Sequence, residues 1–394
     1  SPFSINQILD IYNFMKSNIL LFFKTFLLIL LFSNVSAEQP RFYIPDSPPI
    51  AAKAFVLMDH NSGKILAGEN ENERRSPASL TKIMTSYVVF KRLKEDFISL
   101  DDEVKISEKA WKTGGSRSFI EVGKMIKLED LLKGMIIQSG NDASVALAEH
   151  VAGSEGTFVL FMNDYAQEIG MENSRFENSS GLPHKDQYTT AKDLALLSSA
   201  IINEFPDFYE WYGQKEFTYN NIKQINRNKL LFTDSTVDGL KTGWTQKAGY
   251  CLATSANRVG MRLLSVVLGS SSPAVRTAET EKLLDYGFRF FETQSVNDIS
   301  HQVPVYKSKV GNIKVGVADS SYLTLPRNQF KYTTQTINLT GDLIAPIKQG
   351  DQVGTLAISF NDEDIATLPL IALENADEAG FVSKMIDTVK LMFR

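Results

Sequence analysis

Two residues near position 80 have the types and the spacing that nucleophilic catalysis needs. Ser79 and Lys82 lie in "RRSPASLTKIMTSYVVF", where a turn of small residues leads into an apolar segment. On a helix, positions i and i+3 share one face with Cβ atoms about 5–6 Å apart, so the lysine amine can reach the serine hydroxyl. A neutral serine is a weak nucleophile and needs a base to accept its proton. The spacing therefore predicts a serine nucleophile with a lysine base.

This role sets a condition on the pKa of Lys82. An unperturbed lysine has a pKa of about 10.4 and is protonated at neutral pH. Burial lowers the pKa because the charged form loses its hydration, and a neighbouring cation lowers it further. A second ammonium group about 5 Å away would contribute roughly 3 kcal/mol at an effective dielectric constant near 20. We therefore expect a second lysine close to Lys82.

Two distant segments supply the remaining polar groups. Lys241, in "DGLKTGW", is the expected second lysine; it should open a strand in which Gly243 lets a substrate backbone lie close. Ser139 and Asn141 lie in "IIQSGNDAS". We expect the serine hydroxyl to relay a proton toward the leaving group, and the Asn141 amide to hold Lys82 or a substrate carbonyl.

The order of these elements is more specific than any one of them. Ser-x-x-Lys begins at residue 79, Ser-x-Asn at residue 139 and Lys-Thr-Gly at residue 241. Ser-x-Asn recurs elsewhere, and a second Lys-Thr-Gly occupies residues 112–114, but that copy precedes residue 139. The combination in this order, each element in a suitable predicted setting, indicates one active site assembled from three distant segments.

This order resembles that of the penicillin-recognising serine acyltransferases. The segments "PASLTKIMT", "LLKGMIIQSGNDASVALAEH", "DGLKTGWTQKAGYCLATSA" and "LLDYGFRFFET" are similar to the low-molecular-mass D-alanyl-D-alanine carboxypeptidases, over about residues 51–293 and more loosely beyond. The resemblance implies removal of the terminal D-alanine from peptidoglycan stem pentapeptides and acylation by β-lactams. It requires neither a metal nor an organic cofactor.

The resemblance also implies a role for each site residue. The implied catalytic residues are Ser79 as nucleophile, Lys82 as base, Ser139 as proton relay, Asn141 as a positioning residue and Lys241 as an electrostatic group. The implied substrate-binding residues are Thr242, Gly243, Trp244, Arg276 and Arg227, and Arg276 is the stronger candidate for holding the free carboxylate of the substrate. The oxyanion hole would consist of the backbone N–H groups of Ser79 and Trp244, and one such donor typically contributes about 3 kcal/mol.

The hydrophobic pattern predicts the elements that must position these residues. Residues 52–70 are typical of two strands around an Asn-Ser-Gly turn, residues 79–170 are mostly helical, and strands return from about residue 239, followed by a helix. Strands on both sides of a helical middle predict an α+β domain, β-lactamase/transpeptidase-like, with an antiparallel sheet flanked by helices. After about residue 295, short β-like segments predict a separate small all-β domain, which the family also carries.

The N-terminal segment is typical of export. "MKSNILLFFKTFLLILLFSNVSA", residues 15–37, carries lysines ahead of an apolar run and ends in small residues that a signal peptidase reads. The uncharged run is too short for an ordinary spanning helix of roughly 20 residues. We expect cleavage after Ala37 and a periplasmic protein. The predicted parts are an upstream extension with a signal peptide (1–37), the serine D,D-peptidase domain (38–295), the all-β domain (296–375) and a terminal helix (376–394).

That terminal helix is predicted to bind a membrane surface. In "GFVSKMIDTVKLMFR", from Gly380 on, two Phe, two Met and three β-branched residues fall within about a 140° arc at 100° per residue, opposite a net positive polar side. This pattern is typical of a helix that lies in the membrane interface without crossing it. It would attach the protein peripherally to the outer face of the cytoplasmic membrane. The alternative is a helix packed on its own domain.

Composition excludes several classes of function. The net charge of −5, without a concentrated basic patch, argues against a nucleic-acid partner. The single cysteine, Cys251, excludes an internal disulfide and lies in a strand-like segment, where a buried apolar role is expected. The four histidines show no metal-ligand spacing, so we expect no dedicated metal site.

Three alternative functions remain to be weighed. A class A β-lactamase would need a Glu-x-x-Leu-Asn loop after Ser139, and neither residues 172–176 nor residues 177–181 fit. A D,D-endopeptidase that cuts cross-links uses the same chemistry, and a non-catalytic wall or shape protein would carry the same motifs as vestiges. The all-β domain and the tail favour the carboxypeptidase.

The loop with Ser180, where some relatives have histidine, should control deacylation. His184 is expected to be a solvated loop residue.

Overall fold

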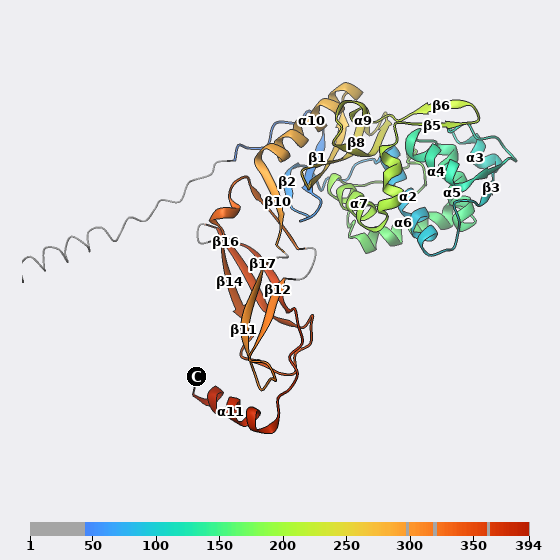
Figure 1. Ribbon diagram of the computed structural model, residues 1–394. Coiled ribbons are helices and arrows are strands. Elements are labelled where there is room, and N and C mark those ends of the chain that lie inside the picture. Colours follow the sequence, from blue (N-terminus) through green and yellow to red (C-terminus); the bar gives the residue numbers. More distant parts are fainter. Residues whose placement is uncertain (1–43, 297–298, 318–320, 361–362, 394) are drawn as a thin grey trace, which may run out of the picture. The chain divides into compact units, whose positions relative to one another are not determined.

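The computed structural model describes residues 44–296, 299–317, 321–360 and 363–393 (Figure 1). The predicted signal peptide, residues 15–37, therefore lies outside the described part of the chain. Within that part, no helix has the length and the apolar character needed to cross a membrane.

A five-stranded antiparallel sheet, in the order β2-β1-β9-β8-β7, organises the first folded part. Its strands are β1 (Ala54–Asp59), β2 (Ile65–Glu69), β7 (Val237–Thr245), β8 (Gly249–Arg258) and β9 (Met261–Ser270). The predicted hairpin of β1 and β2 is confirmed, and β1 pairs with β9, far along the chain. Strand β7 forms one edge of this sheet.

Both faces of the sheet are covered. Along β1, Val56 and Met58 belong to one hydrophobic core, and Phe55 and Leu57 belong to a second one, as the alternation of side chains in a strand requires. Helix α10 (Pro273–Phe290) packs on β8 and β9 within the second core, and α7 (Ala191–Glu204) packs on β1 and β9 within the first. The predicted α+β architecture is confirmed.

The helical middle of the chain packs beyond α7. The long helices there are α2 (Thr81–Lys94), α4 (Leu128–Ile137), α5 (Asn141–Ala152) and α6 (Glu155–Ile169), and α2 contacts each of the others and α7. The shorter elements are η1 (Ala78–Leu80), α3 (Glu108–Lys112), α8 (Pro206–Tyr209), η2 (Glu210–Gly213) and α9 (Leu230–Thr233). The side chains of Ser154, Thr190 and Ser272 cap α6, α7 and α10 by accepting a backbone N–H bond, which determines where these helices begin.

Two short ribbons interrupt this helical region and were not predicted. Strand β3 (Glu103–Lys105) pairs with β4 (Met125–Lys127), and β5 (Glu216–Tyr219) pairs with β6 (Ile222–Ile225). Three or four residues are too few for an alternating pattern to stand out from the helical pattern around them.

The predicted all-β domain is confirmed. Its sheet has the order β14-β16-β17-β12-β11-β15, and a ribbon pairs β10 with β13. The strands are β10 (Phe291–Ser295), β11 (Ser300–Tyr306), β12 (Asn312–Val317), β13 (Tyr322–Pro326), β14 (Thr334–Leu339), β15 (Leu343–Ile344), β16 (Gln352–Phe360) and β17 (Glu363–Ala372), with a short helix η3 (Phe330–Tyr332). Ile313, Val315, Leu356 and Leu370 lie in its apolar core.

The chain continues into helix α11 (Phe381–Met392), and no residue of this helix is buried. Phe381 is 77% exposed and Met392 is 76% exposed. The backbone N–H of Lys307 donates to the Asp387 carboxylate, which connects the helix to the end of β11. The structure thus has a helix within the predicted range 376–394, and most of its apolar side chains are exposed.

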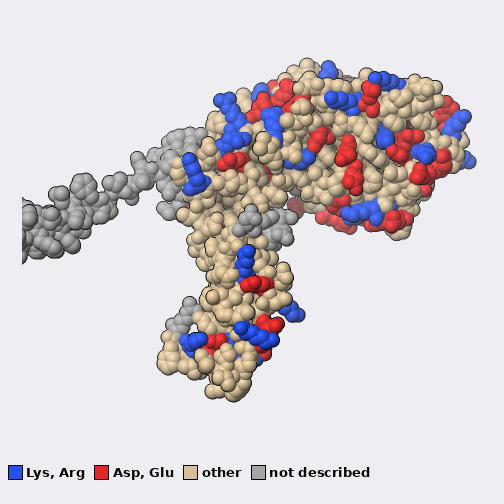
Figure 2. Space-filling model, in the orientation of Figure 1, with Lys and Arg blue, Asp and Glu red and all other residues tan. Residues whose placement is uncertain are grey.

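Charged side chains are interspersed on the molecular face that Figure 2 shows. Lysine and arginine alternate with aspartate and glutamate over the helical region, without a large area of one sign (Figure 2). This agrees with the small net charge of the chain.

Candidate active site

Ser79 lies in η1, at the beginning of α2, where its side chain is half-buried. The preceding residue, Ala78, has a φ of 47°, in the left-handed region that costs a non-glycine residue free energy and is enriched near functional sites. Lys82 occupies the first turn of α2 and is only 1% exposed. Its Nζ lies 3.1 Å from the Ser79 Oγ. The predicted contact between the hydroxyl and the amine is therefore present.

Two further acceptors hold the Lys82 amine. Its Nζ donates to the Asn141 Oδ1 at 2.7 Å, and to the backbone carbonyl of Ser180 at 2.5 Å. Asn141 is thus one of the residues that hold Lys82, which was one of its two expected roles. The Ser180 carbonyl was not predicted, because every residue carries a carbonyl and the sequence gives no signal for the one that points inward.

The environment lowers the pKa of both buried lysines. Burial, and then the Arg227 guanidinium, lower the pKa of Lys82 to about 7, against the opposing effect of the Asp142 carboxylate. Burial also lowers the pKa of Lys241 to well below its usual range, and Lys82, Arg227 and Arg276 add to this effect. The two lysines thus repel each other, and the Arg227 guanidinium, which was not expected to act on Lys82, lowers the pKa of both amines. We expect the two amines to hold fewer than two protons at neutral pH.

Ser139 lies in the connection between α4 and α5, with its side chain buried. Ser139 is 2% exposed and has a φ of 69°, a second left-handed non-glycine residue in the site. Its hydroxyl has no hydrogen-bond partner among the described residues. Because a buried polar atom normally has a partner, the free hydroxyl is available to a ligand or a reacting group.

Strand β7 brings the third element to the site along the edge of the sheet. The sequence predicted that Lys241 opens this strand. The strand instead begins at Val237, so Lys241 lies in its middle. The Lys241 Nζ donates to the carbonyl of Thr242 at 3.1 Å. A Cβ atom added to Gly243 would lie 3.1 Å from the backbone nitrogen of Ser79. Glycine therefore permits the close approach of β7 to the nucleophile.

These segments surround a cleft with a volume of about 1120 Å³. The residues predicted for the site that line it are Ser79, Ser139, Asn141, Arg227, Thr242, Gly243, Trp244 and Arg276. Lys82 and Lys241 lie buried behind this lining. The structure thus brings the whole predicted set to one place, with the two amines beneath the surface of the cleft.

The cleft lining is positively charged. Arg227, Lys229 and Arg276 contribute to it, and none of the described residues that line it is an aspartate or a glutamate. The Arg227 Nη1 donates to the Ser116 Oγ at 2.9 Å, and the Arg276 Nη1 donates to the Cys251 carbonyl at 3.4 Å, while the Arg276 Nε has no partner among the described residues. This lining fits an anionic group such as a carboxylate. Lys229 was missed, since a lysine beside an apolar run resembles a surface residue.

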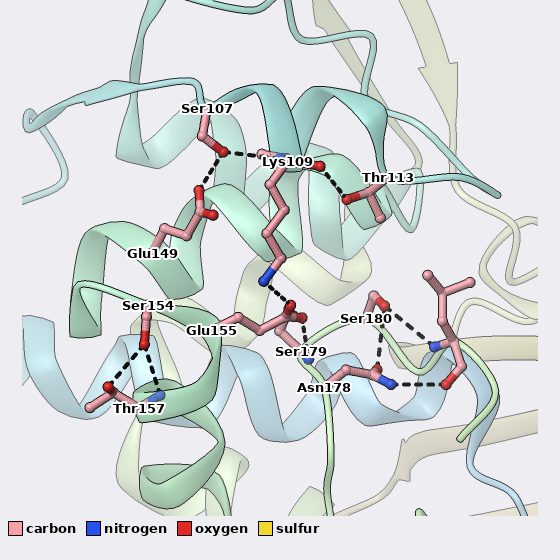
Figure 3. A network of polar contacts seen from close by, with 12 residues as sticks. Ser107, Lys109, Thr113, Glu149, Ser154, Glu155, Thr157, Asn178, Ser179 and Ser180 are labelled. Atoms are coloured by element: carbon pink, nitrogen blue, oxygen red, sulfur yellow. Dashed lines mark hydrogen bonds and ion pairs between the residues drawn. The ribbon is translucent and has the colours of Figure 1, made fainter. Parts of the chain in front are cut away.

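A loop at residues 178–182 supplies the Ser180 carbonyl and is anchored to α6 (Figure 3). The Glu155 carboxylate accepts bonds from the backbone N–H and the hydroxyl of Ser179, at 3.1 and 2.8 Å, and forms a 2.8 Å ion pair with Lys109. Burial opposes ionisation of Glu155, yet these donors lower its pKa. Glu155 was missed, because its partners come from distant segments.

The same loop packs against the residue that precedes the nucleophile. Gly181 has a φ of 85°, and a Cβ atom added there would overlap the carbonyl oxygen of Ala78. The Asn178 Oδ1 accepts a 2.7 Å bond from the Gly181 N–H, which fixes the turn. The loop is therefore held on one side by α6 and on the other by η1.

The remaining candidates lie outside the cleft. His184 is exposed, as expected, and the Glu177 carboxylate pairs with Arg175 at 2.6 Å. Cys251 is buried in β8, and burial raises the pKa of its thiol to about 11. Lys112, in the second Lys-Thr-Gly, pairs with Glu108 on the surface. Among the described residues no cluster of His, Cys, Asp and Glu side chains could hold a metal ion.

The chain is similar to known proteins over most of its length. Residues 41–272 match the D-alanyl-D-alanine carboxypeptidase family, and residues 288–378 match the penicillin-binding protein 5 C-terminal domain. The D-alanyl-D-alanine carboxypeptidase DacC of Escherichia coli is 44% identical over 361 residues, which is 88% of this chain and 90% of the relative.

Solved structures give the same result. Penicillin-binding protein 5 from Haemophilus influenzae has a TM-score of 0.81 at 39% identity, covering 85% of this chain and all of that one. Penicillin-binding protein D2 from Listeria monocytogenes, solved in a cefotaxime-bound form, has a TM-score of 0.57 at 31% identity and covers 64% of this chain and all of that one. The chain described here therefore belongs to the D-alanyl-D-alanine carboxypeptidase family of serine-type hydrolases.

Proposed function

We propose that this chain removes the terminal D-alanine from peptidoglycan stem pentapeptides through an acyl-enzyme intermediate on Ser79. The observation that carries the proposal is the Lys82 Nζ, 3.1 Å from the Ser79 Oγ, with its pKa lowered to about 7. An amine with this pKa is substantially neutral at physiological pH and can accept the serine proton. Family membership supports the same activity.

In the acylation step, the Ser79 Oγ attacks the carbonyl carbon of the penultimate D-alanine while its proton moves to Lys82. The backbone N–H groups of Ser79 and Trp244 stabilise the oxyanion. The bond to the last residue then breaks, and the leaving nitrogen receives a proton through the Ser139 hydroxyl. The products are an ester on Ser79 and free D-alanine.

In the deacylation step, water is the nucleophile and the Ser79 oxygen is the leaving group. Water attacks the ester carbonyl and gives a proton to Lys82, and the Ser79 oxygen leaves and regains a proton. The loop at residues 178–182 contributes a carbonyl to Lys82 and no carboxylate to the cleft, which supports a peptidase rather than a class A β-lactamase. Asn141 keeps the Lys82 amine oriented in both steps. Lys241 interacts with the charge of Lys82, so the two amines influence each other's protonation.

The cationic lining favours carboxypeptidase action over endopeptidase action. A carboxypeptidase substrate ends in a free carboxylate next to the scissile bond. The Arg276 Nε, buried and unpaired among the described residues, is available for such a group, and Thr242 and Arg227 line the same cleft. We assign β-lactams as covalent inhibitors at Ser79, in line with the relative solved with cefotaxime. A vestigial, non-catalytic protein would have no need for the lowered pKa of Lys82.

We propose further that the protein acts in the periplasm, attached to the outer face of the cytoplasmic membrane by α11. Seven apolar side chains of this region are exposed: Phe381, Val382, Met385, Ile386, Val389, Met392 and Phe393. Apolar area of this kind, next to lysines, suits an interfacial helix. Deleting residues 380–394 should move the protein from the membrane fraction to the soluble fraction while activity on a soluble peptide is unchanged. Unchanged fractionation would contradict the assignment.

Two assays test the enzymatic proposal. Fluorescent penicillin should label the chain, Ser79→Ala should abolish the labelling, and the exposed Ser99→Ala should leave it intact. Incubation with a pentapeptide should release free D-alanine. Release of dimer halves from cross-linked muropeptides, without free D-alanine from the pentapeptide, would replace the carboxypeptidase assignment by an endopeptidase.

A further inference from the structure

A second hollow adjoins the active-site cleft where β7 ends. It has a volume of about 290 Å³, and we call it the distal pocket; its lining includes Glu73, Arg74, Arg75, Lys185, Tyr188 and Lys247. Three chain segments line both hollows. Residues 76–79, 182–185 and 246–247 each contribute one end to the cleft and the other end to the distal pocket. A ligand that lies in the cleft can therefore extend into the distal pocket along the same three segments.

The distal pocket carries more positive than negative charge. Its lining holds four cationic side chains and one carboxylate, and the 2.5 Å ion pair of Arg75 with Glu73 uses that carboxylate. The Arg74 guanidinium lies over the Tyr188 ring, 4.5 Å from its centroid, and donates to the Asn173 amide oxygen at 3.2 Å.

The two lysines of the pocket lack such partners. Lys185 and Lys247 are exposed, and neither forms an ion pair with another described residue. They approach from two different segments, the loop after Leu182 and the turn between β7 and β8. The two ammonium groups are therefore free to attract an anion, and the Arg74 guanidinium adds a third positive charge to the lining.

The direction of β7 determines which part of a bound peptide reaches the distal pocket. A peptide that binds beside an edge strand in extended form follows that strand. Its free C-terminal carboxylate belongs near Thr242 and Arg276, so its N-terminal part must run past Trp244 toward Gln246 and Lys247. Each extended residue advances about 3.3 Å, so a group two or three residues before the scissile bond lies roughly 7–10 Å further along. That is where β7 ends and Lys247 follows.

We propose that the distal pocket binds a free carboxylate that the stem peptide carries two or three residues before the scissile bond. This inference rests on the proposed function, because it takes the peptide to be bound along β7 with its reacting carbonyl at Ser79. Two positions of a stem peptide can supply the group: the α-carboxylate of a γ-linked glutamate at the second residue, or the additional carboxylate of a dicarboxylic diamino acid at the third residue. The shared chemistry is a carboxylate between Lys185 and Lys247, and Arg74 adds a third cation.

The test uses three synthetic pentapeptides and the full chain. The parent peptide has free carboxylates at its second and third residues, and each of the other two is amidated at one of these residues. We expect kcat/KM for D-alanine release to be about fivefold higher for the parent than for one of the amidated peptides, as suits two solvent-exposed lysine–carboxylate contacts. The amidated peptide that loses activity identifies the source of the carboxylate.

The variant Lys185→Gln/Lys247→Gln should bring this ratio close to one while fluorescent penicillin still labels it at the normal rate. The matched control is Lys105→Gln/Lys348→Gln, which removes two exposed lysines elsewhere and should keep the fivefold preference. A parallel measurement of the affinity of Ser79→Ala chains for the same peptides gives a readout that needs no turnover.

The outcomes separate the two proposals. Equal efficiency for all three peptides in the unmodified chain, or a preference that survives in Lys185→Gln/Lys247→Gln, would overturn the distal-pocket assignment and leave the carboxypeptidase intact. Absence of D-alanine release, together with tighter binding of the parent peptide by Ser79→Ala that is lost on lysine replacement, would overturn the proposed activity and support the pocket.

Discussion

Helix α2 carries the proposed catalytic base and helix α11 is the proposed membrane anchor. The first is mostly buried and the second is exposed. Ten of the fourteen residues of α2 are buried, including Lys82, whereas none of the residues of α11 is buried. Apolar residues occur all round α2, which is the pattern of a helix enclosed by others. In α11 they form one stripe with lysines beside it. The position of a helix in the fold thus decides what a lysine in it can do.

The difference has a chemical consequence. In α2, burial and the Arg227 guanidinium lower the pKa of Lys82 to about 7, so this lysine is suited to be a base. Lys384 in α11 is only partly covered and forms an ion pair with Glu378 at the surface. Enclosure converts the same side chain from a surface charge into a proton acceptor, at the cost of removing it from water.

The largest expected effect comes from removing the enclosed amine. Lys82→Met keeps most of the side-chain volume but removes the base, so we expect acylation by fluorescent penicillin to fall about a thousandfold. Lys384→Met in α11 is the matched control and should leave the acylation rate unchanged. A Lys82→Met rate within a factor of about ten of the unmodified chain would show that another group accepts the serine proton.

A pair of methionine truncations tests the packing side of the comparison. Met84 in α2 is 0% exposed, and Met385 in α11 is 56% exposed. Met84→Ala should lower the free energy of unfolding by about 3 kcal/mol, because it leaves a cavity in the core. Met385→Ala should change it by less than about 0.5 kcal/mol. Urea denaturation of both variants measures the difference, and equal losses would mean that α11 is packed against the fold.

Two glycines test how tightly the N-terminus of each helix is held. A Cβ atom at Gly181 would overlap the Ala78 carbonyl, beside the start of α2, whereas one at Gly380, beside the start of α11, would meet nothing within 4 Å. Gly181→Ala should displace the nucleophile and slow acylation about a hundredfold, since a shift near 1 Å can have this effect. Gly380→Ala should leave the rate unaltered. Normal acylation of Gly181→Ala would show that the loop at residues 178–182 does not position the nucleophile.

The smallest expected effect comes from a charge beside α2. Arg227→Gln removes a cation that lowers the pKa of Lys82, so this pKa should rise. Lys82 would then be protonated over a wider pH range, and the acylation rate at neutral pH should fall severalfold and recover as the pH is raised. The pH profile of acylation for this variant measures the change. A profile that moves to lower pH would contradict the assigned role of Arg227.

The sequence predicted those parts of the site that follow from local geometry or from the family motifs. The three-residue spacing brings Lys82 to Ser79, and the motif order brings Ser139 and Thr242 to the same cleft. The hairpin, the antiparallel sheet and the all-β domain followed from the periodicity of apolar residues and from the resemblance.

The parts that escaped prediction depend on tertiary contacts that leave no pattern in the chain. The inward-pointing carbonyl of Ser180 is chemically the same as every other carbonyl. Glu155 anchors Ser179 because α6 begins beside the loop, although the two residues are distant in sequence. The effect of Arg227 on Lys82 escaped prediction for the same reason: charges interact through space, and their distances are set only when the helices and β7 have packed.

The pH dependence of acylation of the unmodified chain tests the central assignment most directly. Lys82 accepts the serine proton only when neutral, so the second-order rate of labelling by a fluorescent penicillin should be low in acid and rise with pH through about 7. The penicillin should carry no group that titrates between about pH 5 and pH 9. A rate that is constant over this range, or one that rises only near the ordinary lysine pKa of about 10.4, would contradict a neutral Lys82 beside Ser79.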